Sequence, residues 1–322
     1  MRKRISVVTP LFNEQSNVVE LCQRVAAVMK SLPYDYEHLC IDNCSTDDTV
    51  AILRQIAATD PSLKVIVNAR NFGYIRSSYH GLLQADGDAV VLIASDLQDP
   101  PEMIRDFVQK WEEGFKTVMA VKPVSEESRL MFRLRKVYYR IVSRISEVSL
   151  VQNATGSGLF DRAVLNVLRS IQDPYPYFRG LVCEVGFPIA TVPFKQPRRV
   201  RGVSSQNFYS LYDMAMLGIT KHSKVPLRLM TISGFVLAFV SLLIAFGYLV
   251  AKLLFWNAFV LGTAPILIGI FFFGALQMMF LGLLGEYIGA IQTQVRNLPL
   301  VVEAERIGFG PGAHERTEVD SE

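Results

Sequence analysis

The stretch VVLIASDLQDPPE, residues 90–102, contains the strongest indication of how this chain folds. It begins as an apolar run typical of a buried strand, then changes to acidic and amide side chains followed by two prolines. Carboxylates at the tip of a buried strand indicate that a charged group is held there. A metal site would normally have a second carboxylate two residues before Asp96, but that residue is Ala94. The question is whether Asp96 and Gln98 suffice to bind a metal ion.

Short β-branched runs and helical patterns alternate on both sides of this stretch. The expected strands are residues 5–9, 38–41, 64–67, 89–94 and 117–121, and the expected helices are residues 16–30, 47–58, 76–85 and 101–113. This alternation predicts an α/β fold, with a mostly parallel, Rossmann-like sheet covered by helices on both faces. Ser45, three residues before Asp48, resembles a capping box that opens the second helix.

Polar residues follow the first four predicted strands. They are Asn13-Glu14, Asp42-Asn43, Arg70-Asn71 and Asp96-Leu-Gln98. In open parallel sheets the ligand lies beyond the carboxyl ends of the strands. Four polar clusters at one edge therefore predict a nucleotide-binding site there.

Two long segments near the C-terminus carry no charged side chain, residues 229–251 and 253–285. Each exceeds the ~20 residues that a helix needs to cross a bilayer. Buried core helices are the alternative, but the length and uniformity of both segments favour two transmembrane helices. We therefore expect a cytosolic domain over 1–228, a transmembrane hairpin over 229–291 and a partly disordered cytosolic tail over 292–322.

Basic residues predict how the hairpin is oriented. Lys221, Lys224 and Arg228 precede the first span, Arg296 and Arg306 follow the second, and only Lys252 lies between them. The positive-inside bias then places both flanks in the cytoplasm, with the protein in the inner (cytoplasmic) membrane. The N-terminal residues run straight into a strand, so we expect no signal peptide. The net charge of +3 is too small to indicate nucleic acid as a partner.

Four motifs resemble the signature of family 2 glycosyltransferases with a GT-A fold. They are TPLFNE (9–14), CIDNCSTDDT (40–49), ARNFG (69–73) and ASDLQDPPE (94–102). Together with GLLGEYIG (282–289), they are similar to those of polyprenyl-phosphate glycosyltransferases, the group of dolichol-phosphate mannose synthase and of enzymes that load glucose or aminoarabinose onto undecaprenyl phosphate. The resemblance implies inverting, Mg²⁺- or Mn²⁺-dependent transfer from a nucleotide sugar, with UDP the expected nucleotide, to a polyprenyl phosphate lipid.

The resemblance also implies roles for individual residues. Those expected to bind the nucleotide sugar are Pro10, Phe12, Glu14, Asp42, Asn71 and Asp96. Asp96 and Gln98 would bind the metal ion. Arg179, in YFRGL, matches a family arginine and is expected to bind the acceptor phosphate; a local ion pair with Glu184 is the alternative.

Three departures from the family pattern affect the expected chemistry. The usual Asp-Ala-Asp is Ala94-Ser95-Asp96, and the usual Asp-Asp-Gly after the second strand is Asp42-Asn43-Cys44. Gly156 stands where the family has a proposed catalytic Asp, which leaves Asn153 and Asp161 as candidate catalytic residues. A phosphate monoester with a second pKa near ~6 is already ionised and needs no general base. The loss at Gly156 therefore favours a lipid phosphate acceptor.

Two further basic segments could hold that phosphate. Arg133, Lys136, Arg140 and Arg144 recur at helical spacing and predict an amphipathic helix at the membrane surface. Arg199 and Arg201 lie in a Pro-rich loop that could grip phosphate oxygens. A plain surface helix and a solvated loop are the respective alternatives.

Other interpretations remain open at this point. A transferase that extends a lipid-linked oligosaccharide at a hydroxyl would need a base near Asn153 or Asp161. A degenerate relative would bind the nucleotide without turnover. Gly282, Gly285 and Gly289 allow close helix packing, which suggests a homo-oligomer.

Overall fold

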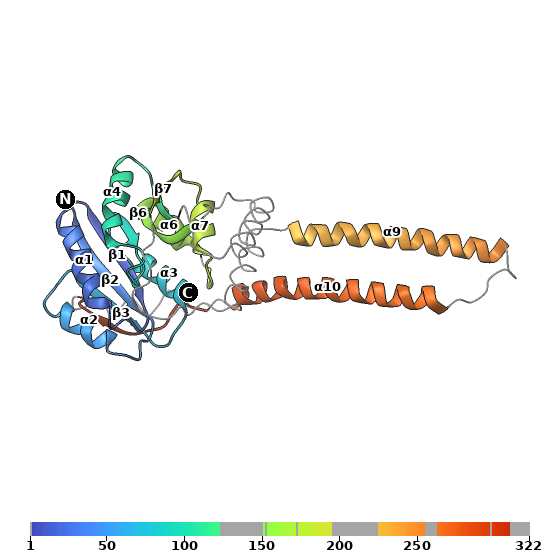
Figure 1. Ribbon diagram of the computed structural model, residues 1–322, viewed down its shortest axis with the longest axis horizontal. Coiled ribbons are helices and arrows are strands. Elements are labelled where there is room, and N and C mark those ends of the chain that lie inside the picture. The colour runs from blue at the N-terminus through green and yellow to red at the C-terminus, as the bar shows by residue number, and fades with distance from the viewer. Residues whose placement is uncertain are drawn as a thin grey trace, which may run out of the picture.

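The computed structural model describes residues 2–122, 151, 153–171, 173–194, 225–254, 263–296 and 298–309. A globular part holds a sheet with helices packed against it, and two long helices extend from one side of it (Figure 1). Of the predicted acceptor-binding residues, Arg133, Arg199 and Arg201 lie outside the described residues. The predicted amphipathic helix that carries Arg133, Lys136, Arg140 and Arg144 also lies outside the described residues.

A mixed sheet forms the centre of the globular part. Its strands are β1 (Arg4–Leu11), β2 (Asp35–Asp42), β3 (Leu63–Asn68), β4 (Ala89–Leu92), β5 (Thr117–Val121), β6 (Ala154–Asp161), β7 (Ile189–Pro193) and β8 (Glu303–Ile307). Their order is β7-β5-β6-β4-β1-β2-β3-β8. Strands β1 to β4 pair in parallel, whereas β6 runs antiparallel to both β4 and β5. The predicted α/β fold with a mostly parallel sheet is confirmed.

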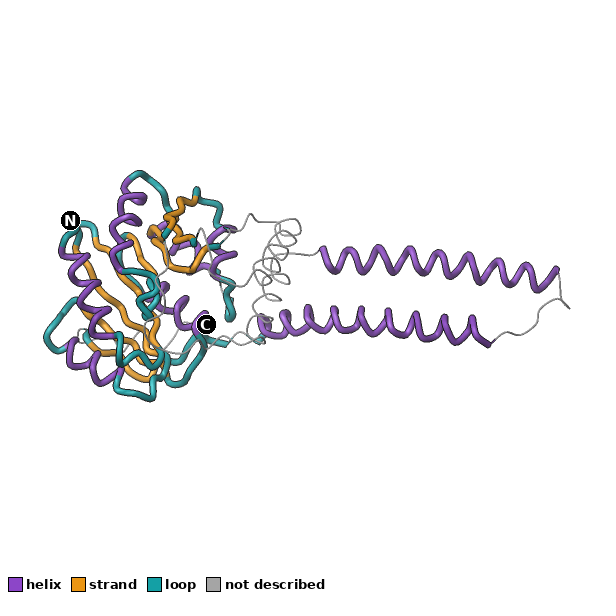
Figure 2. Tube along the Cα trace, in the orientation of Figure 1, coloured by secondary structure: helices purple, strands orange, loops and turns teal. Residues whose placement is uncertain are grey.

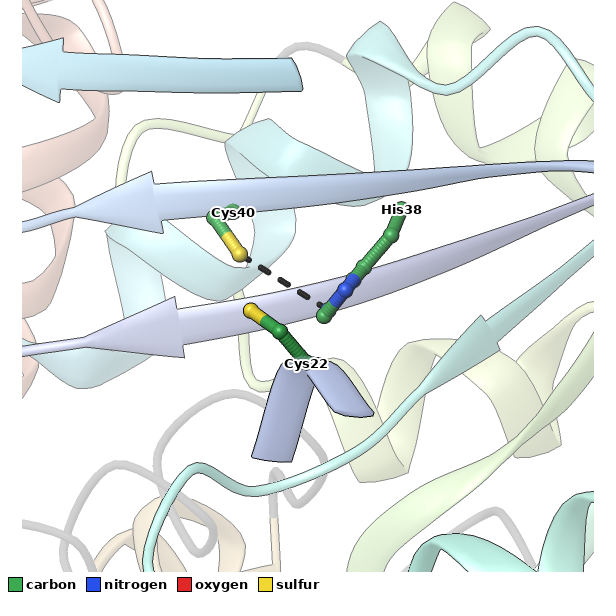
Figure 3. Close-up of side chains that lie close together, drawn as sticks. All are labelled: Cys22, His38 and Cys40. Carbon is green, nitrogen blue, oxygen red and sulfur yellow. Dashed lines mark hydrogen bonds between the residues drawn. The ribbon is translucent and has the colours of Figure 1, made fainter. Parts of the chain in front are cut away.

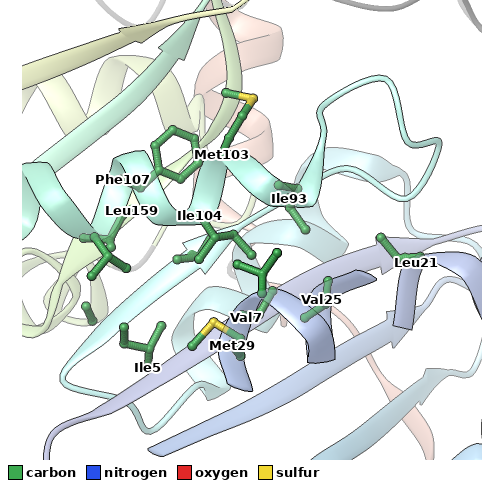
Figure 4. Packing of buried hydrophobic residues seen from close by; sticks show 14 of the residues in the cluster. Ile5, Val7, Leu21, Val25, Met29, Ile93, Met103, Ile104, Phe107 and Leu159 are labelled. Carbon is green, nitrogen blue, oxygen red and sulfur yellow. The ribbon is translucent and has the colours of Figure 1, made fainter. Parts of the chain in front are cut away.

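Helices cover both faces of this sheet because successive strand side chains point to opposite faces. The helices are α1 (Val18–Lys30), α2 (Thr49–Ala57), α3 (Tyr74–Gln84), the short 3₁₀ helix η1 (Pro101–Met103), α4 (Ile104–Glu112), α6 (Arg162–Ser170) and α7 (Phe178–Glu184). Ile5 and Val7 of β1 pack with residues of α1, α2 and α4 in one core, part of which is drawn in Figure 4. Val8 packs on the opposite face with residues of α3, α6 and α7.

The predicted capping box at the start of α2 is wrong. Ser45 Oγ donates to Asp42 Oδ1 across 2.5 Å, so its hydroxyl serves the end of β2 instead of the helix. The helix begins at Thr49, whose backbone N–H donates to Asp47 Oδ1. The polar residues after β2 therefore shape a loop at the edge of the sheet.

The chain returns to the globular part after the second long helix, which the sequence did not predict. Strand β8 pairs antiparallel with β3 and is the outermost strand on that side of the sheet. Glu303 of β8 accepts from Arg306 and lies 2.7 Å from His80 Nε2 of α3. Arg76 of α3 donates to the carbonyl oxygen of Leu300. Part of the predicted 292–322 tail therefore belongs to the globular domain, which the sequence predicted to end at residue 228.

The two long helices are α9 (Val225–Leu254) and α10 (Thr263–Val295). They run side by side in opposite directions, away from the globular part (Figure 2). They expose large apolar side chains such as Phe235 (72%) and Met278 (70%). Within the described residues, one stretch, Phe272–Val295, is long and apolar enough to cross a membrane, and Leu227–Ser241 is a shorter apolar stretch. The second transmembrane helix therefore stays a prediction.

Candidate functional site

The strand directions determine which predicted residues meet at one edge. Leu92, at the carboxyl end of β4, pairs with Gly158, and Ala89, at its start, pairs with Asp161. Because β6 is antiparallel to β4, the first residues of β6 lie beside the loops that follow the parallel strands. The candidate site therefore combines the loops after β1 to β4 with the start of β6.

Asp42 anchors the loops that follow β1 and β2. Its side chain is fully buried and accepts from both the backbone N–H and the hydroxyl of Ser45. Burial raises the pKa of Asp42, and the bonds from Ser45 oppose this rise. Asn13, at a φ of 56°, donates its N–H to Ser45 Oγ and accepts from the N–H of Thr46. The two loops are thereby held together at the edge of the sheet.

Amide side chains fix the loop that follows β3. Asn43 Nδ2 donates to Asn71 Oδ1 across 2.8 Å, and Asn43 Oδ1 accepts from Asn68 Nδ2 and from the Phe72 N–H. Asn43 stands where the family pattern has an aspartate. An amide can donate and accept at once, so Asn43 can join neighbours that an ionised aspartate could only accept from. Asn71 is placed by this network, with its side chain at the surface.

Glu14 connects the loop after β1 with the tip of β4. Its Oε1 accepts from Ser95 Oγ at 3.1 Å, and its Oε2 accepts from Asn17 Nδ2 at 2.7 Å. Pro10 lies within β1 opposite Ile41, so it can contribute to a site through the shape of its ring and through its backbone. Phe12 is 45% exposed, so its ring is accessible at the same edge.

Asp96 and Gln98 form a tight turn beyond β4. The Gln98 N–H donates to Asp96 Oδ1 at 3.1 Å, and Leu97 between them has a φ of 57°. This turn brings residues 96 and 98, which carry a carboxylate and an amide side chain, to one half-buried place at the edge of the sheet. Mg²⁺ and Mn²⁺ prefer oxygen ligands and usually take only one or two from the protein when a nucleotide supplies the others. The residues present fit such an ion without a carboxylate at Ala94.

Asp99 also lies at this edge, although the sequence did not indicate it as a candidate site residue. It is 4% exposed and accepts from Ser157 Oγ of β6 at 2.5 Å. Burial raises the pKa of the Asp99 carboxyl group, and hydrogen bonds from Ser157 and Thr155 oppose this rise. The one signal available beforehand was the second acidic residue of the SDLQDPP stretch.

Arg179 contacts the same segment of β6. Its Nη2 donates to the carbonyl oxygen of Thr155 at 3.2 Å. Gly156 follows with a φ of 105°, and a β-carbon there would stand 3.8 Å from Arg179 Nε. The charges of Arg179, Asp99 and Asp96 all act on the phenol of Tyr74, at the start of α3. A cation, two carboxylates and an exposed tyrosine therefore share this part of the edge.

Asp161 does not lie at this edge, so the structure does not bring this predicted catalytic residue together with the other candidates. It pairs with the start of β4, at the opposite edge of the sheet. It caps α6 by accepting from the Ala163 N–H, and it also accepts from Trp111 Nε1 at 2.7 Å and from Lys116 Nζ at 3.1 Å. Burial works to raise the pKa of Asp161, but these hydrogen bonds lower it overall. Its role is structural.

Asn153 precedes β6 and stays at the candidate edge. It is exposed, has a φ of 59°, and its carbonyl oxygen accepts from the Lys122 N–H at 3.1 Å. An amide side chain has no basic lone pair that titrates near neutral pH, so Asn153 can orient a ligand but cannot serve as a general base.

The α/β fold with its mostly parallel sheet has the GT-A architecture, and comparison with known proteins identifies the family. Residues 6–169 match the family described as glycosyl transferase family 2. The chain belongs to this family and is a glycosyltransferase.

Relatives resemble the chain over nearly its whole length. An uncharacterized glycosyltransferase of Synechocystis sp. is 31% identical, with 96% of this chain and 97% of the relative covered. The bactoprenol glucosyl transferase of Shigella phage SfII is 33% identical, with 92% and 96% covered. Among solved structures, glucosyl-3-phosphoglycerate synthase from Mycobacterium tuberculosis, in complex with Mn²⁺, UDP and glucosyl-3-phosphoglycerate, is 21% identical; 68% of this chain and 78% of that chain are covered, with a TM-score of 0.43.

Proposed function

We propose that this glycosyltransferase moves a sugar from a UDP-sugar to a polyprenyl phosphate at the cytoplasmic face of the membrane. The observation that carries the proposal is the pairing of Arg179 with Gly156 at the carboxyl edge of the sheet. A cation stands where an acceptor could approach, and the neighbouring position that holds a carboxylate in the family pattern has no side chain.

This pairing suits an acceptor that arrives as an anion. A phosphate monoester has a second pKa near ~6, so most of it is a dianion at neutral pH and can attack without giving up a proton. Arginine binds phosphate oxygens with several N–H donors arranged in a fork. A carboxylate at residue 156 would repel the dianion and compete for Arg179, whereas glycine leaves the approach open.

The donor would occupy the other half of the edge. Asp42 and Glu14 are held by Ser45 and Ser95 in the loops expected to receive the nucleoside. Asp96 and Gln98 would hold Mg²⁺ or Mn²⁺, which when bound neutralises the charge of a departing diphosphate. The protein's own contribution is to supply both oxygen ligands from one hydrogen-bonded turn.

The long helices support a membrane location. Phe235 and Met278 are among many large apolar side chains that α9 and α10 expose, a pattern that calls for an apolar environment. The chain leaves the globular part into α9 and returns from α10 to β8, so both ends of the hairpin lie on the same side (Figure 1). This arrangement is the one that the basic flanking residues favour for a hairpin inserted from the cytoplasm.

Transfer to a sugar hydroxyl is less well supported. It requires a general base close to the attacking oxygen. Asp161 lies at the opposite edge, and Asn153 cannot accept the proton. Asp99 lies near Gly156, but it is 4% exposed and already accepts from Ser157.

A direct assay tests the proposal. Purified full-length protein in detergent would be incubated with Mn²⁺, a panel of labelled nucleotide sugars and one of three acceptors: undecaprenyl phosphate, undecaprenol or an oligosaccharide-linked lipid. We expect labelled lipid only with undecaprenyl phosphate. Product only with the alcohol or the oligosaccharide lipid would contradict the proposed acceptor, and no product with any donor would support a relative without turnover.

A further inference from the structure

Three buried side chains on the far side of β2 from the amide network point toward one another: Cys22, His38 and Cys40 (Figure 3). His38 and Cys40 are two residues apart on β2, so their side chains project from the same face of the sheet. Cys22 approaches that face from α1, which packs against it. One ligand atom from each residue lies within 4.8 Å of the other two, and Cys40 Sγ is 3.7 Å from His38 Nε2.

We propose that Cys22, His38 and Cys40 form a binding site for a Zn²⁺ ion. Two thiolates and one imidazole are a ligand set that Zn²⁺ prefers, and a fourth ligand completes its tetrahedral coordination. Two ligands on one strand and one on a packed helix need no rearrangement of the backbone to converge. The three residues come from elements that the fold already fixes, so the site is formed before the ion arrives.

Both thiols must lose their protons when a metal ion binds. A thiolate, not a thiol, is the species that binds a metal ion. When the ion binds, the thiol protons of Cys22 and Cys40 are released to solvent. Thr9 Oγ1, which lies 3.0 Å from His38 Nε2, gives up that contact.

A small pocket gives access to the cluster. Its lining includes Cys22 and His38 together with Tyr36, Asp60 and Ser62. The negative charge of Asp60 acts on the Cys22 thiol, so a carboxylate stands close to the open side of the cluster. This side can supply the fourth ligand, either as the carboxylate or as a water molecule.

A metal ion here would act on the architecture and not on the sugar chemistry. Cys40 is two residues before Asp42, at the end of the same strand. A bond through the ion would tie α1 to β2 and hold the strand that carries Asp42. A ligand that binds the folded state alone raises stability by mass action. The site is independent of the proposed transfer reaction.

Cobalt substitution tests the site in the intact protein. Purified, reduced, metal-free full-length protein would be titrated with Co²⁺, which gives a thiolate-to-metal charge-transfer band in the near ultraviolet only when cysteine sulfur coordinates it. We expect this band to saturate at about one ion per chain and to disappear when Zn²⁺ is added. Oxygen ligands at Asp96 and Gln98 give no such band, so that site does not interfere.

Variants assign the ligands. Cys22→Ser and Cys40→Ser should each weaken binding at least ~10-fold, whereas Cys183→Ser, which changes a cysteine outside the cluster, should leave it unchanged. Zn²⁺ should raise the Tm of the wild-type protein and not that of Cys22→Ser. Absence of a charge-transfer band in the folded wild-type protein, or an unchanged band in Cys22→Ser, would overturn the proposal. A Cys22–Cys40 disulfide that forms in air without any metal binding in the reduced protein would also overturn it.

Discussion

Ser157 donates its hydroxyl hydrogen to Asp99 across 2.5 Å and so joins the first residues of β6 to the loop that follows β4. The same short segment accepts from Arg179 through the carbonyl oxygen of Thr155. One piece of chain therefore positions both the turn of Asp96 and the arginine proposed to bind the acceptor. Loosening this segment should therefore affect both halves of the edge, the donor half through the turn of Asp96 and the acceptor half through Arg179.

Removing the Ser157 hydroxyl tests this arrangement. In Ser157→Ala, Asp99 loses a close hydrogen-bond donor while staying buried, which should cost about 1–3 kcal/mol of unfolding free energy. We also expect the KM for the nucleotide sugar and the KM for undecaprenyl phosphate both to rise, because the segment of Ser157 borders the turn of Asp96 and Arg179 alike. Thermal melts and initial rates at varied concentrations of each substrate measure both effects. Ser170→Ala, which removes a surface hydroxyl of α6, is the control; equal behaviour of the two variants would refute the positioning role of Ser157.

Arg179 should matter for the acceptor and little for the donor. Arg179→Ala removes charge-assisted hydrogen bonds worth about 1.5–3 kcal/mol each, so the KM for undecaprenyl phosphate should rise roughly 10- to 100-fold. Arg179→Lys keeps the charge but not the fork and should recover part of the loss. Steady-state kinetics with each substrate varied separately distinguish these effects. A rise in KM that is as large for the donor as for the lipid would count against Arg179 as the acceptor ligand.

Asp96 and Asp161 should respond oppositely to the same substitution. Asp96→Asn removes the carboxylate from the proposed metal turn and should lower kcat about 100-fold or more with Tm unchanged, since several kcal/mol of charge stabilisation are lost. Asp161→Asn should lower Tm through its contacts with Trp111 and Lys116 while the rate per folded molecule stays near normal. Comparing the rate per molecule of folded protein in the two variants separates the loss of catalysis from the loss of stability. A large loss of kcat in folded Asp161→Asn would restore that residue to the catalytic candidates.

The junction between β8 and α3 should be sensitive to acid. Burial works to raise the pKa of Glu303, but hydrogen bonds from His80 and Arg306 lower it to about 2. A carboxyl group whose pKa is lower in the folded state stabilises that state above its unfolded pKa, and the stabilisation is lost as pH falls toward the folded pKa. The Tm difference between wild type and Glu303→Gln should therefore be full near pH 7 and shrink between about pH 4.5 and about pH 2.

Glu305→Gln is the matched control for this pH dependence. Glu305 belongs to the same strand and pairs with Arg54 at the surface, where an ion pair contributes about 0–1 kcal/mol. Its substitution should change Tm little at any pH. A Tm difference for Glu303→Gln that stays constant from pH 7 down to pH 3 would show that the ionised carboxylate does not stabilise the junction.

Local patterns were sufficient to predict most of the sheet and the meeting of its polar loops at one edge. The strands ending near Thr9, Asp42 and Val67 are apolar runs followed by polar residues, so their direction and their shared edge follow from the chain itself. The Asp96 turn was predicted for the same reason. These features depend on residues close together in sequence.

The features that the sequence did not predict depend on pairing between distant segments. Asn153 and Asp161 are near neighbours in the chain, but the eight residues of β6 place them at the two opposite ends of the strand. Asp99 is joined to the start of β6 by its hydrogen bond with Ser157, which is 58 residues away in the chain. Strand β8 is rich in charged residues and therefore resembles a solvated tail in the sequence. Its place in the sheet depends on contacts with distant segments, such as that between Glu303 and His80.

Manganese binding in the presence of UDP shows whether the turn of Asp96 and Gln98 holds the donor diphosphate through a metal ion. Free Mn²⁺ gives a strong electron paramagnetic resonance signal that broadens on binding, so the bound fraction can be titrated in the full-length protein. We predict one ion per chain that requires UDP, with affinity at least ~10-fold lower in Asp96→Asn and unchanged in Asp161→Asn. Equal affinity in wild type and Asp96→Asn would show that the turn of Asp96 does not hold the metal ion.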